Sequence, residues 1–288
     1  MKQLLILSGK GGTGKTTLAS AFIRMGNPDG FADCDVEAPN LHLVSGRTDY
    51  FESEEFFGLD KAVIDLDKCL QCGKCAEHCA FGAIRMEKNM PIVDSMACEG
   101  CGVCQIVCPN DAVTMQPNRV GETAVFPDKP YFSTAELDIG AGNSGRLVTE
   151  VKRKMKEKTS SDASWTIIDG SPGIGCPVIA SLSGADLVLM VTEPTQSGIS
   201  DLKRIVDTAR HFRSLMAVCI NKWDQNRELS KKIEEYCFQE KLIMVGKIPY
   251  DSKVGKILNQ GKTIVDEFCR AGIAARKIYQ KTITLLGS

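Results

Sequence analysis

Eight cysteines of this 288-residue chain fall into two copies of one spacing, C-x2-C-x2-C-x3-C. The first copy comprises Cys69, Cys72, Cys75 and Cys79, and the second comprises Cys98, Cys101, Cys104 and Cys108. Disulfide frameworks are typical of small secreted chains, and zinc ribbons use pairs of C-x2-C rather than three close cysteines with a distant fourth. The spacing therefore favours iron–sulfur ligation over either alternative.

The two runs resemble those of bacterial two-cluster ferredoxins, in which three cysteines of one run and the fourth of the other bind each [4Fe–4S] cluster. This resemblance implies one cluster held by Cys69, Cys72, Cys75 and Cys108, and a second held by Cys98, Cys101, Cys104 and Cys79. Pro109 follows the second run, whereas Ala80 stands where the ferredoxin pattern has proline after the first. We expect that change to loosen the turn without removing a ligand.

A second pattern lies near the beginning of the chain, after the apolar run Leu4 to Leu7. It reads Gly9-Lys10-Gly11-Gly12-Thr13-Gly14-Lys15-Thr16-Thr17 and matches G-x-x-x-x-G-K-[ST], a phosphate-binding loop between a strand and a helix. Its glycines allow backbone N–H groups to face phosphate oxygens, and the helix N-terminus adds positive potential. Lys15 would neutralise the β- and γ-phosphates, and the Thr16 hydroxyl would bind Mg²⁺.

Lys10 makes this loop more specific, because a lysine directly after the first glycine resembles the deviant Walker A motif of the MinD/ParA/nitrogenase-iron-protein family. In that family this lysine reaches the nucleotide of a partner subunit, which implies a nucleotide-dependent homodimer. The resemblance covers residues 1–59 and 119–288 and implies a MinD-like P-loop ATPase domain. The cysteine runs then imply a small inserted α+β domain of the bacterial ferredoxin kind at 60–118.

Further positions of the family follow in order along the chain. Asp35 resembles the switch I aspartate that positions the attacking water. Asp169-Gly170-Ser171-Pro172-Gly173 resembles switch II, which senses the γ-phosphate and Mg²⁺. Asn221 resembles the adenine-contacting asparagine, and Ile248-Pro249-Tyr250-Asp251 resembles the second loop at the base edge. Asn221-Lys222-Trp223-Asp224 also matches N-K-x-D, which selects guanine in regulatory GTPases, so GTP remains the alternative to ATP.

Alternating strand and helix patterns predict the fold class. Apolar runs lie at Leu4–Leu7, Trp165–Ile168, Leu187–Val191, Leu215–Ile220 and Leu242–Val245, and helical patterns lie at Asp201–Phe212, at Arg227–Glu240 and from Thr263 onward. Strands that are apolar throughout indicate a mainly parallel sheet flanked by helices on both faces, as in α/β P-loop NTPases. The aspartates of the two switches and Asn221 follow strand ends, where such sheets bind ligands.

Composition and charge set the remaining expectations. Thirteen cysteines without an export signal predict a reducing cytoplasm. A net charge of −1 and the short apolar runs predict neither a nucleic-acid nor a membrane partner. The basic stretch Lys152-Arg153-Lys154 is expected to be a solvated helix face. Cys176 lies at the offset from Asp169 at which the nitrogenase iron protein has a bridging-cluster cysteine, but no second cysteine stands between Val120 and Trp165, so we expect a packing or interface residue.

Two functions fit these features. In the first, a slow ATPase couples nucleotide-dependent changes of its dimer to electron transfer from two [4Fe–4S] clusters to an unidentified redox or metalloprotein partner. The alternative is an ATP-dependent factor that assembles or inserts iron–sulfur or other metal clusters. Full cysteine ligation indicates stably held clusters and favours the first function. Spatial positioning, as in MinD or ParA, would leave the clusters without a role.

Overall fold

The computed structural model describes residues 1–45, 51–159 and 163–287 and divides the chain into two compact units. The first, here called the sheet unit, comprises Met1–Glu54, Thr123–Glu136 and Ser144–Ser288. The second, the cysteine unit, comprises Glu55–Glu122 and Leu137–Asn143. The segment 60–118, predicted from sequence to form an inserted domain, lies within this unit.

Nine strands of the described residues form one sheet, in the order β13-β12-β11-β1-β10-β2-β9-β8-β3. The pairs from β13 to β9 are all parallel, as predicted. Their bounds are β1 Lys2–Leu7, β2 Gly30–Asp33, β9 Tyr131–Leu137, β10 Trp165–Asp169, β11 Leu187–Thr192, β12 Leu215–Asn221 and β13 Ile243–Ile248. β3 (Glu52–Phe57) and β8 (Arg119–Phe126) complete the order, and with β9 they carry the chain between the units.

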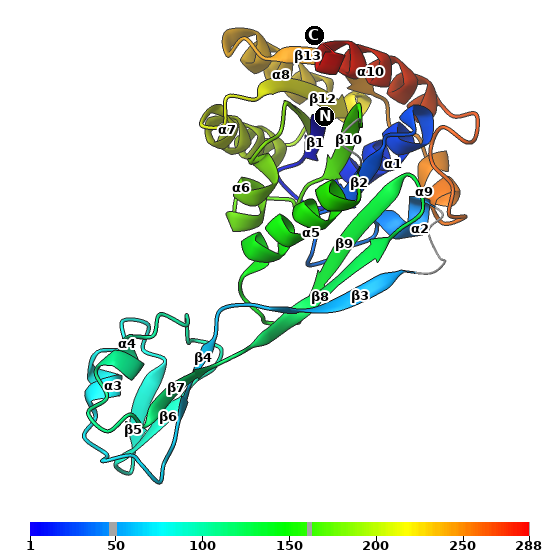
Figure 1. Cartoon of the computed structure of the whole chain (residues 1–288). Coiled ribbons are helices and arrows are strands. Elements are labelled where there is room, and N and C mark those ends of the chain that lie inside the picture. Colours follow the sequence, from blue (N-terminus) through cyan, green and yellow to red (C-terminus); the bar gives the residue numbers. More distant parts are fainter. Residues whose placement is uncertain (46–50, 160–162, 288) are drawn as a thin grey trace. The chain divides into compact units, whose positions relative to one another are not determined.

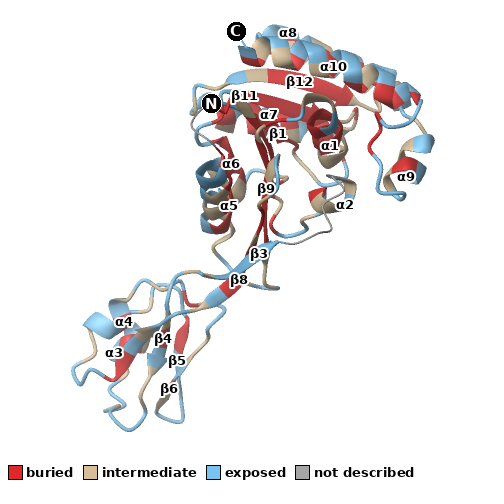
Figure 2. Ribbon diagram, turned by 45° about the vertical axis from the view of Figure 1, so that its right-hand side comes forward, coloured by how far each residue is buried: buried red, intermediate tan, exposed pale blue. Residues whose placement is uncertain are grey.

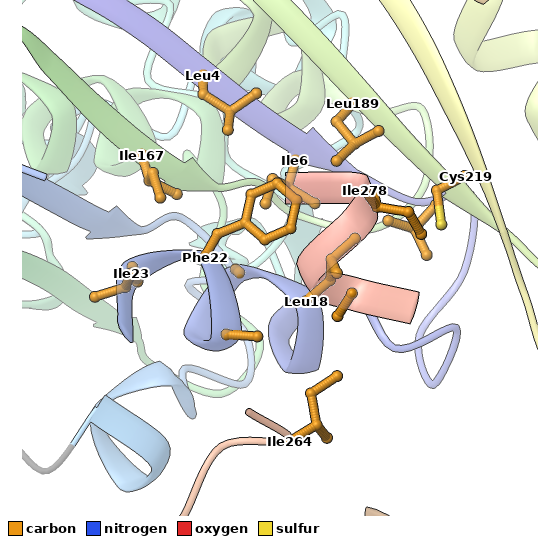
Figure 3. Packing of buried hydrophobic residues seen from close by; sticks show 14 of the residues in the cluster. Leu4, Ile6, Leu18, Phe22, Ile23, Ile167, Leu189, Cys219, Ile264 and Ile278 are labelled. Atoms are coloured by element: carbon orange, nitrogen blue, oxygen red, sulfur yellow. The ribbon is translucent and has the colours of Figure 1, made fainter. Parts of the chain in front are cut away.

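Helices cover both faces of this sheet (Figure 1). On one face, α1 (Lys15–Gly26) and α10 (Arg270–Gly287) pack against alternate strand residues such as Ile6, Ile167 and Leu189, as Figure 3 shows. The opposite face is covered by α5 (Ser144–Lys158), α6 (Cys176–Leu182), α7 (Gln196–Arg210) and α8 (Arg227–Gln239). The short helices are α2 (Leu41–Ser45), α9 (Lys253–Leu258) and the 3₁₀ turn η1 (Trp223–Gln225). No helix of the described residues is long and apolar enough to cross a membrane.

Two sequence predictions in this unit are wrong. The helix expected from Thr263 begins only at Arg270, because the Asp266 carboxylate accepts the Thr263 N–H at 2.9 Å and its hydroxyl at 2.8 Å and so closes a turn. The stretch around Lys152 is not a purely solvated face. Lys152 is half-buried, and its Nζ donates to three carbonyls at the end of α6, those of Ala180, Ser181 and Ser183.

The cysteine unit consists of two similar halves. β4 (Lys61–Ile64) pairs antiparallel with β7 (Val113–Gln116), and β5 (Ile84–Glu87) pairs antiparallel with β6 (Met90–Val93). Two one-turn helices, α3 (Lys74–Glu77) and α4 (Val103–Ile106), each follow one cysteine turn. Among the described residues, the buried cluster of this unit contains three cysteines and only four other side chains, which are all aliphatic: Ala62, Ala83, Ile84 and Val113. Figure 2 shows that most of this unit is exposed or only partly buried.

Candidate functional site

The loop of residues 8–14 connects β1 to α1 and is shaped for a close approach of the backbone to an anion. Gly12 and Gly14 have φ values of 78° and 90°, which side chains strongly disfavour. A Cβ atom on Gly14 would also lie 2.4 Å from the Asn221 Nδ2 atom. Among the residues that the structure describes, no side chain caps the N-terminus of α1, so its first backbone N–H groups are available to a phosphate.

Lys15 is buried at the first position of α1, with 5% of its side chain exposed. Its Nζ lies 2.8 Å from Asp169 Oδ1 and 3.7 Å from Asp35 Oδ2. Burial alone would lower the pKa of Lys15, but the carboxylates of Asp169 and Asp35 outweigh it and raise that pKa above its ordinary value. The structure therefore brings together three of the four catalytic residues predicted from sequence, around one buried cation.

Asp33, at the end of β2, is a site residue that sequence reasoning missed. Its Oδ1 accepts the Asp35 N–H at 3.0 Å, and its Oδ2 accepts those of Asn40 and Leu41 at 3.0 and 2.9 Å. Burial and the neighbouring Asp169 raise its pKa to about 7. Asp33 thus holds the backbone of the segment that carries Asp35. Its position two residues before the predicted switch I residue Asp35 was the available signal.

Asp169 ends β10 and has a second carboxylate oxygen, Oδ2, that is buried without a hydrogen-bond partner among the described residues. The turn after it is fixed by two backbone bonds, Gly170 N–H to Ile6 O at 2.9 Å and Gly173 N–H to Ser8 O at 3.0 Å. An unpaired buried carboxylate oxygen is costly unless a cation or water binds it. Oxygen ligands of this kind, with the Thr16 hydroxyl in the first turn of α1, fit Mg²⁺.

Lys10 stands apart from this cluster and is partly exposed, at 37%. Its Nζ lies 3.7 Å from Glu193 Oε2 and 3.3 Å from Ser197 Oγ. Glu193 directly follows β11 and also pairs with Lys222. Glu193 belongs to no sequence motif, so the sequence analysis did not identify it. Within one chain Lys10 is therefore held away from Lys15, which leaves its side chain near the surface of the loop.

A cavity of about 340 Å³ adjoins the phosphate-binding loop. Its lining includes Gly12, Gly14 and Thr17 of the loop and helix together with Asn221, Pro249 and Asp251, so the predicted base-contacting residues gather at one place. The Asn221 Nδ2 donates to Thr13 O at 2.7 Å. This bond ties the end of β12 to the loop.

Two aspartates near this cavity are engaged by the backbone of the chain. Asp224 Oδ1 accepts the Tyr250 N–H at 2.7 Å, and Asp251 Oδ2 accepts the Arg270 N–H at 2.7 Å at the start of α10. Hydrogen bonds from Lys253 and Arg270 lower the pKa of Asp251, which favours its charged form. Asp251 is therefore part of the cavity wall, and Asp224 holds the backbone of Tyr250, which also lines the cavity.

The eight cysteines of the two runs line two separate cavities in the cysteine unit. Cys69, Cys72, Cys75 and Cys108 line one, and Cys79, Cys98, Cys101 and Cys104 line the other. Each cavity therefore takes three cysteines from one run and the last cysteine of the other. All eight are free thiols.

The two runs have the same backbone conformation. The residue two positions after the first cysteine has positive φ in both, 55° at Gln71 and 66° at Gly100. The residue after the second cysteine does too, 74° at Gly73 and 75° at Gly102. The turn after Cys79, where Ala80 stands in place of proline, is closed by the Gly82 N–H to Cys79 O bond at 3.1 Å.

Backbone amides surround several of these sulfur atoms. The Gln71 N–H donates to Cys69 Sγ at 3.4 Å, and the Ala112 N–H donates to Cys108 Sγ at 3.2 Å. Burial raises the pKa of Cys79 and Cys108, but nearby backbone N–H groups outweigh it and lower both values, which favours the thiolate.

No three His, Cys, Asp or Glu side chains of the described residues converge as they would around a single metal ion. A [4Fe–4S] cluster uses one thiolate per iron, so its ligands surround a larger body than one ion. Four thiols around each of two cavities therefore fit a cluster better than a lone zinc ion.

The remaining cysteines have simple surroundings. Cys34, Cys219, Cys237 and Cys269 are buried, and burial raises the pKa of the first three to about 12. Cys176 is exposed at the first position of α6.

Known proteins resemble this chain in sequence and in structure. Residues 4–264 match the family described as CobQ/CobB/MinD/ParA nucleotide binding domain. The uncharacterized protein MJ0578 of Methanocaldococcus jannaschii is 31% identical over 285 residues, which cover 97% of this chain and 95% of that protein.

Solved structures show the same fold at low identity. The McdA(D38A)–ATP complex of Cyanothece has a TM-score of 0.58 and 16% identity, with 100% of this chain and 96% of that chain covered. MinD of Pyrococcus horikoshii complexed with Mg-ADP has a TM-score of 0.56 and 18% identity, with 99% and 97% covered.

Proposed function

The chain belongs to the CobQ/CobB/MinD/ParA nucleotide-binding family, and from that premise we propose that it is a Mg²⁺-dependent ATPase that carries two [4Fe–4S] clusters. ATP binding and hydrolysis would change a homodimer and so control electron transfer to a partner metalloprotein. The observation that carries this proposal is the grouping of eight free thiols into two sets of four within a chain that also has a phosphate-binding loop.

The buried charges around Lys15 support the nucleotide part of the proposal. Lys15 pairs with Asp169 and lies near Asp35, so incoming phosphates would compete with these carboxylates for its Nζ. Mg²⁺ would compensate the carboxylates that lose Lys15, with the unpaired Oδ2 of Asp169 as the nearest available oxygen. Asp35, held by Asp33, would orient the attacking water.

The engagement of Asp224 supports ATP over GTP. Guanine selection by N-K-x-D needs a free carboxylate facing the base, whereas Asp224 accepts the Tyr250 N–H and lies 3.6 Å from an Arg270 nitrogen. The amide of Asn221 and the backbone near Pro249 remain as polar groups for adenine in the adjoining cavity.

The partly exposed Lys10 supports a nucleotide-dependent homodimer. Its contacts within the chain, to Glu193 and Ser197, are long and partly solvated, so exchanging them costs little. A phosphate of a second subunit would be a stronger partner than Glu193, because phosphate carries more charge.

The thiols of the cysteine unit would hold the clusters, with backbone N–H groups near Cys69 and Cys108 stabilising the thiolates. Such clusters supply one-electron transfer at potentials set by hydrogen bonds and exposure. The segment whose backbone Asp33 holds continues in sequence through α2 and β3 into the cysteine unit. A conformational change in that segment would therefore be passed to the cysteine unit along the chain. Switch segments that respond to the γ-phosphate are a common source of such coupling.

Substitutions in the sheet unit test the ATPase. Lys15→Ala should abolish ATP binding, Asp35→Ala should bind ATP but hydrolyse it slowly, and Lys10→Ala should bind ATP without dimer formation. Lys156→Ala, an exposed lysine of α5, is the matched control. Normal turnover and dimerisation by Lys10→Ala would overturn the homodimer.

Comparing redox states tests the coupling. We expect ATP affinity to differ between oxidised and dithionite-reduced protein by about 5- to 100-fold, the usual range for linked sites. Identical affinities, with an EPR signal unaffected by ATP, would reject the coupling. Loss of the clusters to an added apoprotein in the presence of ATP would instead favour the cluster-assembly alternative.

A further inference from the structure

A groove of about 420 Å³ runs between β13 and α10, on the sheet unit. Its floor is apolar and includes Val245 of the strand with Ile273 and Ala274 of the helix, and Ile273 is 41% exposed. A Cβ atom on Gly246 would lie 2.7 Å from Ile278 Cγ1, so α10 packs directly on the strand backbone here. The groove is therefore narrow and has a strand as one wall.

Four cations line this groove, and no carboxylate of the described residues does: Lys247, Arg270, Lys277 and Lys281. Lys247 pairs with Glu234 at 2.8 Å and Arg270 with Asp224 at 3.6 Å. Lys277 and Lys281 lie one turn apart on α10, are exposed, and have no ion-pair partner in the described part of the chain. The groove thus carries uncompensated positive charge above an apolar floor.

β13 is the end strand of the sheet order, with β12 as its single neighbour among the described strands. An edge strand presents backbone N–H and C=O groups that another extended chain can pair with. In Figure 1, β13 and α10 lie side by side at this end of the sheet. The groove therefore offers backbone hydrogen bonds, apolar contact and positive charge together.

We propose that this groove binds an extended acidic segment of a partner protein, which adds to the edge of β13. Side chains of an added strand alternate between its two faces, so acidic residues at every second position would meet Lys277 and Lys281. Backbone pairing supplies affinity, and the lysines select for acidic side chains.

A nucleic acid fits the groove less well. Proteins that bind single strands combine cations with aromatic side chains on which bases stack, and none of the residues that line this groove is aromatic. Duplex DNA is bound mainly through many phosphate contacts on an open basic surface, whereas here the cations flank a narrow apolar floor.

The test uses the full chain, purified anaerobically and free of nucleotide, and a fluorescent peptide of about eight residues that alternates glutamate and threonine. We expect saturable binding in fluorescence anisotropy, weakened by salt. Lys277→Glu combined with Lys281→Glu should lower the affinity at least about tenfold, through the loss of two attractive charges and the gain of two repulsive ones. Lys156→Glu, an exposed lysine on α5, should leave it unchanged. A peptide that alternates lysine and threonine should not bind.

Three results would overturn the proposal: no saturable binding of the acidic peptide, an equal loss of affinity in Lys156→Glu, or tighter and equally groove-dependent binding of a single-stranded oligonucleotide. Circular dichroism spectra of the variants show whether they are folded, and all the substituted lysines are exposed. The measurement needs neither nucleotide nor clusters, so its outcome is independent of the proposed ATPase and redox function.

Discussion

Lys15 lies next to two carboxylates, and this sets the energetics of the nucleotide site. Asp169 and Asp35 face it directly, and Asp33 lies buried behind them with a pKa raised to about 7. A buried cluster with more carboxylates than cations is stabilised by any ligand that brings in Mg²⁺. The site is therefore built to bind phosphate and metal together.

Removing the Lys15 charge should destabilise the protein even without nucleotide. Lys15→Met leaves Asp169 buried without its cation, and breaking such a pair costs about 3–5 kcal/mol. We expect this loss in the free energy of unfolding, measured by urea denaturation. Adding Asp169→Asn should recover part of it, because the stranded charge is gone. A double variant less stable than Lys15→Met would contradict this account of the site.

At the residue scale, local motifs could be read from sequence, and contacts between distant segments could not. Lys15 and Asp169 were found because spacing and strand ends identify them. Glu193, which pairs with both Lys10 and Lys222, follows a strand end but belongs to no motif. The role of Asp33 depends on the fold of the loop that it holds, which no single-residue pattern specifies.

At the element scale, the half-buried side chain of Lys152 links α5 to the end of α6. Lys152 of α5 donates to the carbonyls of Ala180, Ser181 and Ser183 at 3.0, 2.7 and 2.6 Å. These carbonyls lie at the C-terminal end of α6, where helices leave acceptors without intrahelical partners and favour a cation. α6 follows the Asp169 turn in the chain, so this contact fixes an element attached to the nucleotide site.

Lys152→Met should test that contact, because it keeps most of the apolar stem and removes the donor. We expect a loss of about 1–3 kcal/mol in the free energy of unfolding, since three partly buried carbonyls lose their partner. The matched control is Lys156→Met on the same helix, where the lysine is exposed and little change should follow. Equal losses of unfolding free energy in the two variants would show that the hydrogen bonds of Lys152 do not stabilise the protein, and that only helix propensity changes.

The central strands were predictable because they are apolar on both faces, as in β11, which is buried throughout. The strands β3, β8 and β9 at the other end of the sheet were not predicted. β3 is largely exposed and rich in glutamate, so no apolar pattern marks it. The start of α10 was misplaced because the turn closed by Asp266 uses side-chain bonds that helical periodicity does not reveal.

At the scale of the whole molecule, the two units differ in what stabilises them. The sheet unit has a large apolar core on both faces of its sheet (Figure 2). In the cysteine unit, the thiols of Cys75, Cys98 and Cys104 make up much of the buried cluster. Small units with so little apolar core commonly rely on disulfides or metal to stay folded. Bound clusters would therefore supply most of its stability.

Removing the iron should unfold the cysteine unit and leave the sheet unit folded. After anaerobic treatment with a chelator and oxidant, we expect hydrogen exchange to lose protection across residues 55–122. Protection in β1 and β11 should persist. The control is the same treatment of Cys176→Ser, which changes an exposed thiol outside the unit and should behave like the wild type. Full protection of the cysteine unit after iron loss would show that its apolar core suffices.

The content of iron and acid-labile sulfide in anaerobically purified protein tests the central claim most directly. The account predicts about eight of each per chain, as two [4Fe–4S] clusters require. Substituting Cys108 by alanine should disturb the cluster proposed at Cys69, Cys72 and Cys75, although Cys108 belongs to the other run. Zinc in place of iron, or iron without sulfide, in protein reconstituted under strict anoxia would contradict the account.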